Sequence, residues 1–301
     1  MTARLISAAI IVTVVLTAVY FDLKLGEPDS LGYAGLTLVP LVLVMTGLAA
    51  FELTTMIASR NPNTPKSIVI TGAVITVAFA SAPLLWKSYP PDCPVGKLGW
   101  LTLGFAVATC IAILFEMIRF KAAEQVIANL AYSIFAIAYT GFLMSYLPAL
   151  RFYGPNSVGM TALLSLLFIV KFSDAGAYFV GRLFGRTKLA PKMSPAKSVE
   201  GAFGAILFGC LTSFFFFQFF AHKIGGDAIQ VNLVVVLAYG VVIAITGMVG
   251  DLFESIIKRD FKAKDSSSWL PGLGGVLDIF DSILAAAPAA YVFWILGLFT
   301  A

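Results

Sequence analysis

The chain has 301 residues, of which 59% are hydrophobic and only 12% are charged, with a formal net charge of +4. Ordinary soluble domains carry about 25% charged residues, so this composition and a mean hydropathy of +0.94 exclude a soluble domain and indicate an integral membrane protein. Cys93, Cys110 and Cys210 have neither the spacing of metal ligands nor that of a disulfide framework. The single histidine, His222, is interpreted as an interfacial side chain.

Nine apolar segments follow one another along the chain. A helix needs about 20 apolar residues to cross the hydrocarbon core of a bilayer. The first segment could also be a signal peptide, but no small-residue cleavage site closes it, and we interpret it as a membrane helix. We therefore predict an all-α, polytopic membrane protein with nine transmembrane helices, near residues 5–21, 31–56, 67–86, 98–117, 126–149, 157–180, 201–220, 231–257 and 276–299.

The distribution of Lys and Arg between the loops predicts the orientation of these helices. Cytoplasmic loops are enriched in both residues. The side that holds the N-terminus and the even-numbered loops carries 14 of the 20 cations, the opposite side carries 5, and Lys171 lies within the sixth segment. The N-terminus is therefore predicted to be cytoplasmic. Most of these cations lie in the loops after the sixth and eighth segments, as expected either for topology alone or for loops that face a polyanion.

Polar residues divide the chain into two regions. Residues 1–150, with five segments, are interpreted as a transmembrane scaffold, and residues 151–301, with four segments and two cytoplasmic loops, as the catalytic region. The five segments of the first region carry few ionisable residues beyond Glu52, Glu116 and Glu124, each of which lies within reach of a helix end. We expect their charges to reach the membrane interface there.

The stretch from 171 to 205 opens the second region. Lys171 and Asp174 are three residues apart on one helix face, either as a salt bridge that pairs helices or as a functional pair at membrane depth. Ser198 and Glu200 precede the seventh segment in the manner of a helix N-terminus, which suits phosphate but would also cap any helix.

Carboxylates and cations alternate between the eighth and ninth segments, in the stretch that ends "KRDFKAKDSSSWLPGLGGVLDIFD" at Asp281. Asp251 and Glu254 are three residues apart, as are Asp278 and Asp281. Neighbouring carboxylates repel one another unless a cation or a proton lies between them, and Mg²⁺ is the natural cation. The alternative is that Asp278 and Asp281 only stabilise a helix N-terminus. With the adjacent cations and the Gly-rich turn, the pattern indicates phosphoryl or nucleotidyl transfer.

At this point the residues resemble the phosphatidate cytidylyltransferase family, the CDP-diacylglycerol synthases. The resemblance covers residues 155–300 well and the first half only by its apolar pattern. Upstream it is carried by Asp174, Tyr178, Gly181, Arg182, Gly185, Lys188, Leu189, Pro191, Ser194, Pro195, Lys197, Ser198, Glu200, Gly201 and Gly204. Downstream it is carried by Ser255, Lys258, Arg259, Lys264, Asp265, Ser267, Leu270, Pro271, Gly272, Gly274, Gly275, Asp278 and Asp281.

The resemblance implies an enzyme, a nucleotidyltransferase that transfers a cytidylyl group from CTP to phosphatidate with Mg²⁺ and releases pyrophosphate. Asp251, Asp278 and Asp281 are then the expected metal ligands, with Asp265 as a further candidate and room for a second cation. Lys258, Arg259 and Lys264 are expected to bind the triphosphate, and Arg182, Lys188 and Lys197 the lipid phosphate or the nucleotide. The remaining substrate-binding candidates are Asp174, Ser198, Glu200 and Ser255.

Two departures from the family pattern keep other functions open. The family usually has His where this chain has Leu273, and Arg where it has Ile279. The alternatives are a CTP transferase for another lipid phosphate, of the archaeol or polyprenyl type, a catalytically silent family member, and a transporter. A transporter more often shows duplicated halves, whereas polar residues gather here in the second half.

The expected surroundings follow from the same resemblance. The active site should face the cytoplasm in a bacterial inner membrane, with CTP, a lipid phosphate and membrane lipids as partners. No nucleic acid is expected, and family analogy suggests a homodimer.

Overall fold

The computed structural model describes residues 2–27, 33–87, 89–90, 92–120, 125–263, 265–267, 269 and 274–299. Within these residues, nine helices are long and apolar enough to cross a membrane, by length and composition. They coincide with the nine predicted segments, so the predicted all-α polytopic fold is confirmed. The protein is an integral membrane protein.

The chain forms two compact units. The first unit comprises Met1–Ala149 with Phe261–Ile279, and the second comprises Leu150–Asp260 with Phe280–Ala301. The first boundary lies where the sequence analysis divided scaffold from catalytic region. However, residues 261–279, which were grouped with the catalytic region, belong to the first unit. The functional meaning of that division stays a prediction.

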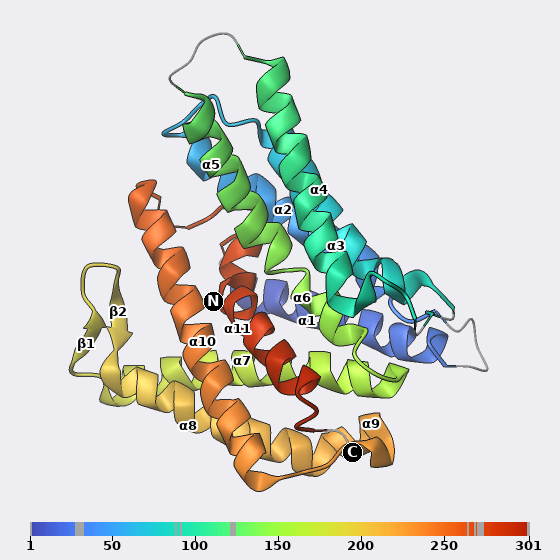
Figure 1. The fold of residues 1–301 in the computed structure, drawn as a ribbon. Coiled ribbons are helices and arrows are strands. Elements are labelled where there is room, and N and C mark those ends of the chain that lie inside the picture. Colours follow the sequence, from blue (N-terminus) through green and yellow to red (C-terminus); the bar gives the residue numbers. More distant parts are fainter. Residues whose placement is uncertain are drawn as a thin grey trace. The chain divides into compact units, whose positions relative to one another are not determined.

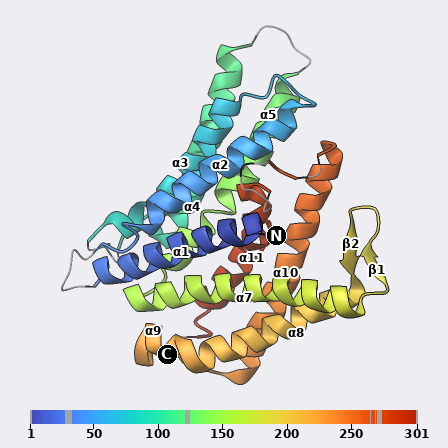
Figure 2. The same cartoon turned by 180° about the vertical axis from the view of Figure 1, so that it is seen from behind.

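The first unit is built from the early membrane helices. Figure 2 shows α2 beside α3 in this unit, and a 3₁₀ turn at Ala82–Leu85 extends α3. A π-helical turn at Ile137–Phe142 follows α5 and packs against α3. The helices are α1 (Thr2–Leu25), α2 (Leu38–Ala58), α3 (Lys66–Ser81), α4 (Gly96–Ile118), α5 (Val126–Ala136) and α6 (Tyr146–Arg151), whose last two residues are in the second unit.

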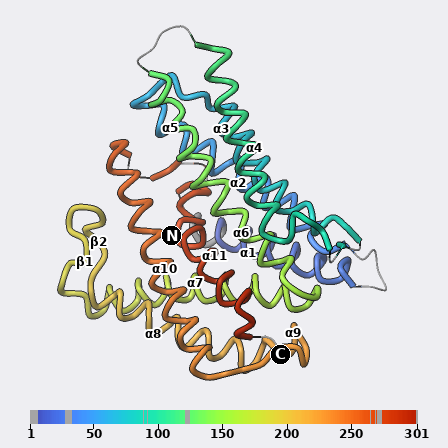
Figure 3. The backbone as a smooth tube through the Cα atoms, viewed as in Figure 1, coloured from blue at the N-terminus to red at the C-terminus, as the bar shows by residue number. Residues whose placement is uncertain are grey.

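The second unit holds the longer helices, α7 (Asn156–Phe184) and α10 (Leu233–Asp260). Figure 1 shows α7 and α8 (Val199–Phe215) side by side, with a hairpin of β1 (Lys188–Ala190) and β2 (Ser194–Ser198) between them in sequence. The strands pair antiparallel, Lys188 opposite Ser198 and Ala190 opposite Ser194. Figure 3 follows the chain from α8 through a π-helical turn (Phe216–Ala221), α9 (His222–Gly225) and a 3₁₀ turn (Gly226–Ala228) into α10.

Helix α11 (Val276–Ile295) contributes its first residues to the first unit and the others to the second. In the second unit, its Trp294 belongs to an aromatic core with Phe217, Tyr239 and Phe299, all fully buried. The rings of Phe217 and Phe299 stack with centroids 4.4 Å apart. Aromatic burial therefore fixes one end of α11, and the carboxylates discussed below lie toward its other end.

Candidate active site

Three carboxylates converge in the second unit. Asp251 and Glu254 of α10 and Asp281 of α11 each offer an oxygen, and these oxygens all lie within 4.8 Å of one another. We call these three residues the carboxylate cluster. Glu254 is fully buried and Asp281 is 7% exposed, whereas Asp251 is half-buried. Negative charges this close repel one another strongly where water does not screen them. The cluster therefore requires compensating positive charge.

Lysines supply part of that charge. Lys197 of β2 lies 2.5 Å from Asp251, and Lys258 lies 2.5 Å from Glu254, one helical turn along α10. Asp281 Oδ1 accepts a hydrogen bond of 2.5 Å from the N–H of Ser282, and among the described residues Asp281 forms no ion pair.

A third ion pair lies next to the cluster. Lys171 and Asp174 pair at 3.9 Å, as their spacing on α7 predicts. Asp174 Oδ1 also accepts a hydrogen bond of 3.4 Å from the hydroxyl of Ser282, which follows Asp281 in α11. Four carboxylates in this part of the second unit therefore lie beside three lysines.

The residues of the cluster fit a divalent cation of the magnesium type. Mg²⁺ is bound through one or two carboxylates together with waters and substrate phosphates. The donor atoms here are all carboxylate oxygens, and two of the three residues are buried. These are the properties of a site that accepts a hard cation.

A close approach of two helices brings these carboxylates together. Gly250 precedes Asp251 on α10, and a Cβ atom at Gly250 would collide with the carbonyl oxygen of Asp281 and lie 2.8 Å from the Cβ of Ala285. Any larger residue at this position would push α10 and α11 apart. The glycine thus sets the distance between the two halves of the cluster.

Asp278, a predicted metal ligand, forms hydrogen bonds at the start of α11, and its assignment to the metal stays a prediction. The residue belongs to the first unit, where its Oδ2 accepts hydrogen bonds from Gly275 N (2.7 Å), Ser266 N (3.1 Å) and Ser266 Oγ (2.7 Å). An acidic side chain at the third helical position that accepts from the N–H preceding the helix forms half of a capping box. Asp278 is thus engaged at the start of α11, and the third member of the cluster is Glu254.

Three further predicted residues lie at the start of α8 and on α10. Ser198 caps α8 by accepting the N–H of Gly201 at 3.1 Å, and both carboxylate oxygens of Glu200 accept the N–H of Thr187, at 3.1 and 3.2 Å. These two residues shape the turn that carries the hairpin. Ser255 is 8% exposed on α10.

The other cations of the predicted site are exposed. Arg182 donates a hydrogen bond of 2.7 Å to the hydroxyl of Tyr178, and Arg259 donates one of 3.4 Å to the carbonyl of Met193 in the hairpin. Lys188 is also exposed in the second unit, and Asp265 is exposed in the first unit. Lys264 and Leu273 lie outside the described residues.

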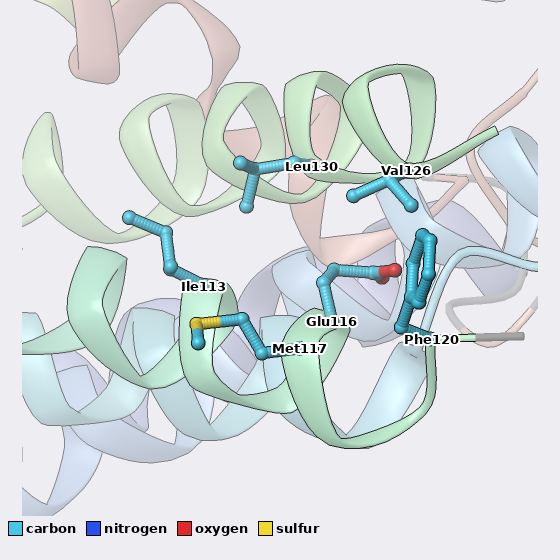
Figure 4. A pocket seen from close by; sticks show the side chains of 6 residues that line it. All are labelled: Ile113, Glu116, Met117, Phe120, Val126 and Leu130. Carbon is cyan, nitrogen blue, oxygen red and sulfur yellow. The ribbon is translucent and has the colours of Figure 1, made fainter. Parts of the chain in front are cut away.

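An apolar cavity in the first unit contains none of the predicted site residues (Figure 4). Its volume is about 310 Å³, and its one ionisable lining residue is Glu116. The carboxylate of Glu116 is paired with Arg119 at 2.6 Å and is therefore neutralised inside the protein. The cavity lies between α4 and α5 and is lined by Ile113, Glu116, Met117, Phe120, Val126 and Leu130.

Glu52 of α2 is a residue whose position sequence reasoning missed. The expectation that its charge reaches the membrane interface is wrong, because the side chain is 1% exposed. Its carboxylate accepts hydrogen bonds from the N–H groups of Val276 and Leu277, at 3.0 and 2.9 Å. The contact joins positions more than 200 residues apart, and no local spacing signals it.

Comparisons with known proteins agree with the resemblance found in the sequence. The family model described as the cytidylyltransferase family matches residues 2–296. The chain is similar to the phosphatidate cytidylyltransferase of Thermotoga maritima, at 37% identity over 60% of this chain and 64% of the relative. It is similar to that of Haemophilus influenzae at 42% identity, over 43% of this chain and 44% of the relative. It is also similar to that of Brucella suis, at 35% over 64% of this chain and 65% of the relative.

These matches span between 44% and 65% of the length of the relatives. The family match is longer and includes the first half of the chain, which the sequence analysis related to the family only by its apolar pattern. The chain belongs to the cytidylyltransferase family.

Proposed function

We propose that the protein transfers a cytidylyl group from CTP to phosphatidate and yields CDP-diacylglycerol and pyrophosphate. The observation that carries the proposal is the carboxylate cluster with its paired lysines, within a member of the cytidylyltransferase family. The relatives named phosphatidate cytidylyltransferase support phosphatidate as the acceptor.

The reaction needs no covalent intermediate on the protein. A phosphate oxygen of phosphatidate forms a bond to the α-phosphorus of CTP, while the bond from that phosphorus to the oxygen bridging to the β-phosphorus breaks. Pyrophosphate leaves with the bonding electron pair. Because phosphate is already a nucleophile, the protein contributes by orienting both substrates and by compensating negative charge.

The lysines of the site are placed for that task. Lys197 and Lys258 bind carboxylates of the cluster, so their positive charges lie beside the proposed metal site. Arg182, Lys188 and Arg259 are exposed and available to anionic groups in solution or at the membrane surface. Lysine and arginine are the side chains that hold phosphate most strongly.

We further propose that Asp251, Glu254 and Asp281 hold the Mg²⁺ on which the reaction depends. When bound, Mg²⁺ supplies positive charge that favours the negative charge developing on the transferred phosphate. Asp278, Asp265 and Lys264 remain predicted members of the site, Asp278 through its position one turn before Asp281 on α11. A homodimer is part of the proposal through family analogy, and the proposal leaves room for a second cation.

We propose that the site faces the cytoplasm in a bacterial inner membrane, which the concentration of Lys and Arg in the loops after α7 and α10 supports. The acyl chains of the lipid would stay in the bilayer, while CTP would reach the cations from the aqueous side. This arrangement accounts for a membrane-embedded enzyme that uses a soluble nucleotide.

Label tracing tests the proposed reaction. Purified protein in mixed micelles receives phosphatidate, Mg²⁺ and CTP labelled at either the α- or the γ-phosphate. The proposal predicts that α-label enters the lipid extract and γ-label enters pyrophosphate, in equal amounts. Label in pyrophosphate without label in lipid would identify CTP hydrolysis and contradict the proposal.

A panel of acceptors tests the alternatives. Phosphatidate, an archaeol-type phosphate and a polyprenyl phosphate are compared under the same conditions. Transfer only to the archaeol-type or only to the polyprenyl phosphate would show that this lipid, and not phosphatidate, is the acceptor. Transfer to none of the three would indicate a catalytically silent family member.

A further inference from the structure

We infer that Glu52 is a positioning residue of the active site, which holds the first turn of α11 and the loop before it in the arrangement that the reaction requires. The predicted effect on turnover rests on the proposed function. The contacts themselves lie within the first unit.

The carboxylate of Glu52 lies within hydrogen-bond distance of four donor groups in the segment before and at the start of α11, and one of them, the hydroxyl of Ser266, shares its single proton with Asp278. Oε1 accepts from Val276 N (3.0 Å) and Ser267 Oγ (2.6 Å), and Oε2 accepts from Leu277 N (2.9 Å) and Ser266 Oγ (3.0 Å). Each oxygen therefore binds one backbone N–H of the helix and one hydroxyl of the loop.

These bonds replace partners that the helix cannot supply. The first four N–H groups of an α-helix have no acceptor within the helix. Glu52 accepts two of them, and Asp278 accepts the N–H of Gly275, the residue before the helix. Two carboxylates at a helix N-terminus are also favoured by the helix dipole.

Burial makes the arrangement specific. Glu52 is 1% exposed, and no lysine or arginine among the described residues lies within ion-pair distance of it. A buried carboxylate without a cation costs several kcal/mol unless hydrogen bonds compensate it. The start of α11 is thus held in the one place where its N–H groups and the two serines meet this carboxylate.

Two carboxylates share one serine at this point. Ser266 Oγ lies 2.7 Å from Asp278 Oδ2 and 3.0 Å from Glu52 Oε2. Ser266 thereby links the glutamate of α2 to an aspartate that the family resemblance places in the active site. A shift of Glu52 must also disturb the hydrogen bonds of Asp278.

The glycine before the helix leaves room for the contact. A Cβ atom at Gly275 would collide with Ser266 Oγ and with both carboxylate oxygens of Glu52. Any side chain at position 275 would thus displace Glu52 from the helix start. Gly275→Ala therefore perturbs the same contact from its other side.

The consequence concerns the register of α11. This helix carries Asp278 in its first turn and Asp281 in the next, and the loop before it carries Asp265. A misplacement of about 1 Å at catalytic groups can lower the rate by roughly 100-fold. Loss of the Glu52 contacts should therefore lower kcat more than it changes KM for CTP.

The test uses the full-length protein and the isosteric variant Glu52→Gln. The glutamine keeps one acceptor oxygen but turns an N–H₂ donor toward the N–H groups of the helix. The matched control is Glu116→Gln. This variant also removes a buried carboxylate from the first unit, because the side chain of Glu116 is 4% exposed. Gly275→Ala is the second variant, for use if Glu52→Gln does not fold.

Hydrogen exchange measures the anchoring without reference to activity. In the wild type, the N–H groups of Val276 and Leu277 should be protected, and Glu52→Gln and Gly275→Ala should speed their exchange at least tenfold. Glu116→Gln should leave it unchanged. Unchanged exchange in both test variants would overturn the inference, even if the wild type transferred no cytidylyl group.

Turnover measures the consequence for the reaction. Glu52→Gln is expected to lower kcat by about 10- to 100-fold with KM for CTP within about threefold, while Glu116→Gln keeps both. Faster exchange at Val276 with unchanged kcat would overturn the positioning role. Absence of transfer in the wild type would instead refute the proposed function, and the exchange result would still decide whether Glu52 anchors α11.

Discussion

Replacing Gly250 by alanine is expected to lower turnover about 100-fold without removing any charged group. The added Cβ would meet the backbone oxygen of Asp281 at a forbidden distance and the Cβ of Ala285 at 2.8 Å. Favourable contacts between carbon atoms begin near 3.5 Å. Helices α10 and α11 must therefore separate by something on the order of 1 Å at the carboxylate cluster, and such a misplacement can cost about 100-fold in rate.

Gly247 provides the matched control one turn earlier on α10. A Cβ atom there would lie 3.7 Å from the Cβ of Ser282 and 3.8 Å from its carbonyl oxygen, which are ordinary contacts. Gly247→Ala should thus keep its turnover, although both substitutions add one methyl group to the same helix.

The assay is pyrophosphate release with CTP and phosphatidate at increasing Mg²⁺, together with thermal unfolding in detergent. Gly250→Ala should lower the rate and raise the Mg²⁺ concentration at half-maximal rate, and overpacking should destabilise the fold by about 1–3 kcal/mol. Equal rates for Gly250→Ala and the wild type would refute the reasoning, as would an equal loss in Gly247→Ala.

Three other substitutions test separate parts of the structure. Glu254→Gln should raise the Mg²⁺ concentration at half-maximal rate at least tenfold, and an unchanged Mg²⁺ titration would remove Glu254 from the metal site. Ser198→Ala should destabilise the fold by about 1 kcal/mol through loss of the α8 cap, seen as a lower Tm than that of Ser194→Ala. Tyr239→Phe, which removes a hydroxyl 3.0 Å from Ser165 Oγ, should cost about 1 kcal/mol in thermal unfolding and leave kcat unchanged, whereas a large loss of kcat would contradict a purely structural role.

The membrane helices could be predicted because their signal is local. A run of about 20 apolar residues is sufficient to identify a span, and each of the nine predicted segments overlaps one of the nine long apolar helices found in the described residues. The spacing of Asp251 and Glu254 likewise places both on one face of α10, although the sequence interpretation assigned only Asp251 to the metal. The structure adds Glu254 to the cluster because its side chain turns toward Asp281.

Local spacing was ambiguous at the start of α11. Asp278 and Asp281 are three residues apart, yet Asp278 accepts the N–H of Gly275 while Asp281 joins the carboxylate cluster. A side chain in the first turn can turn back to the unpaired N–H groups, whereas one in the next turn cannot. The helix start therefore has to be known before the two aspartates can be distinguished.

Contacts between distant parts of the chain could not be predicted from spacing at all. Glu52 lies in the region interpreted as scaffold, yet its hydrogen bonds reach residues more than 200 positions later. Lys197 was expected to bind a phosphate, and in the structure it binds Asp251. Composition predicts that such charges need partners, but tertiary packing decides which ones they have.

The most direct test of the proposed site is the Mg²⁺ dependence of pyrophosphate release in the wild type and in Asp281→Asn. Asp227→Asn, an exposed aspartate in the turn before α10, serves as the control. The account predicts release that needs CTP, phosphatidate and Mg²⁺ together, persists in Asp227→Asn, and disappears in a folded, membrane-inserted Asp281→Asn protein. Normal release by Asp281→Asn would contradict the assignment of the carboxylate cluster as the metal site.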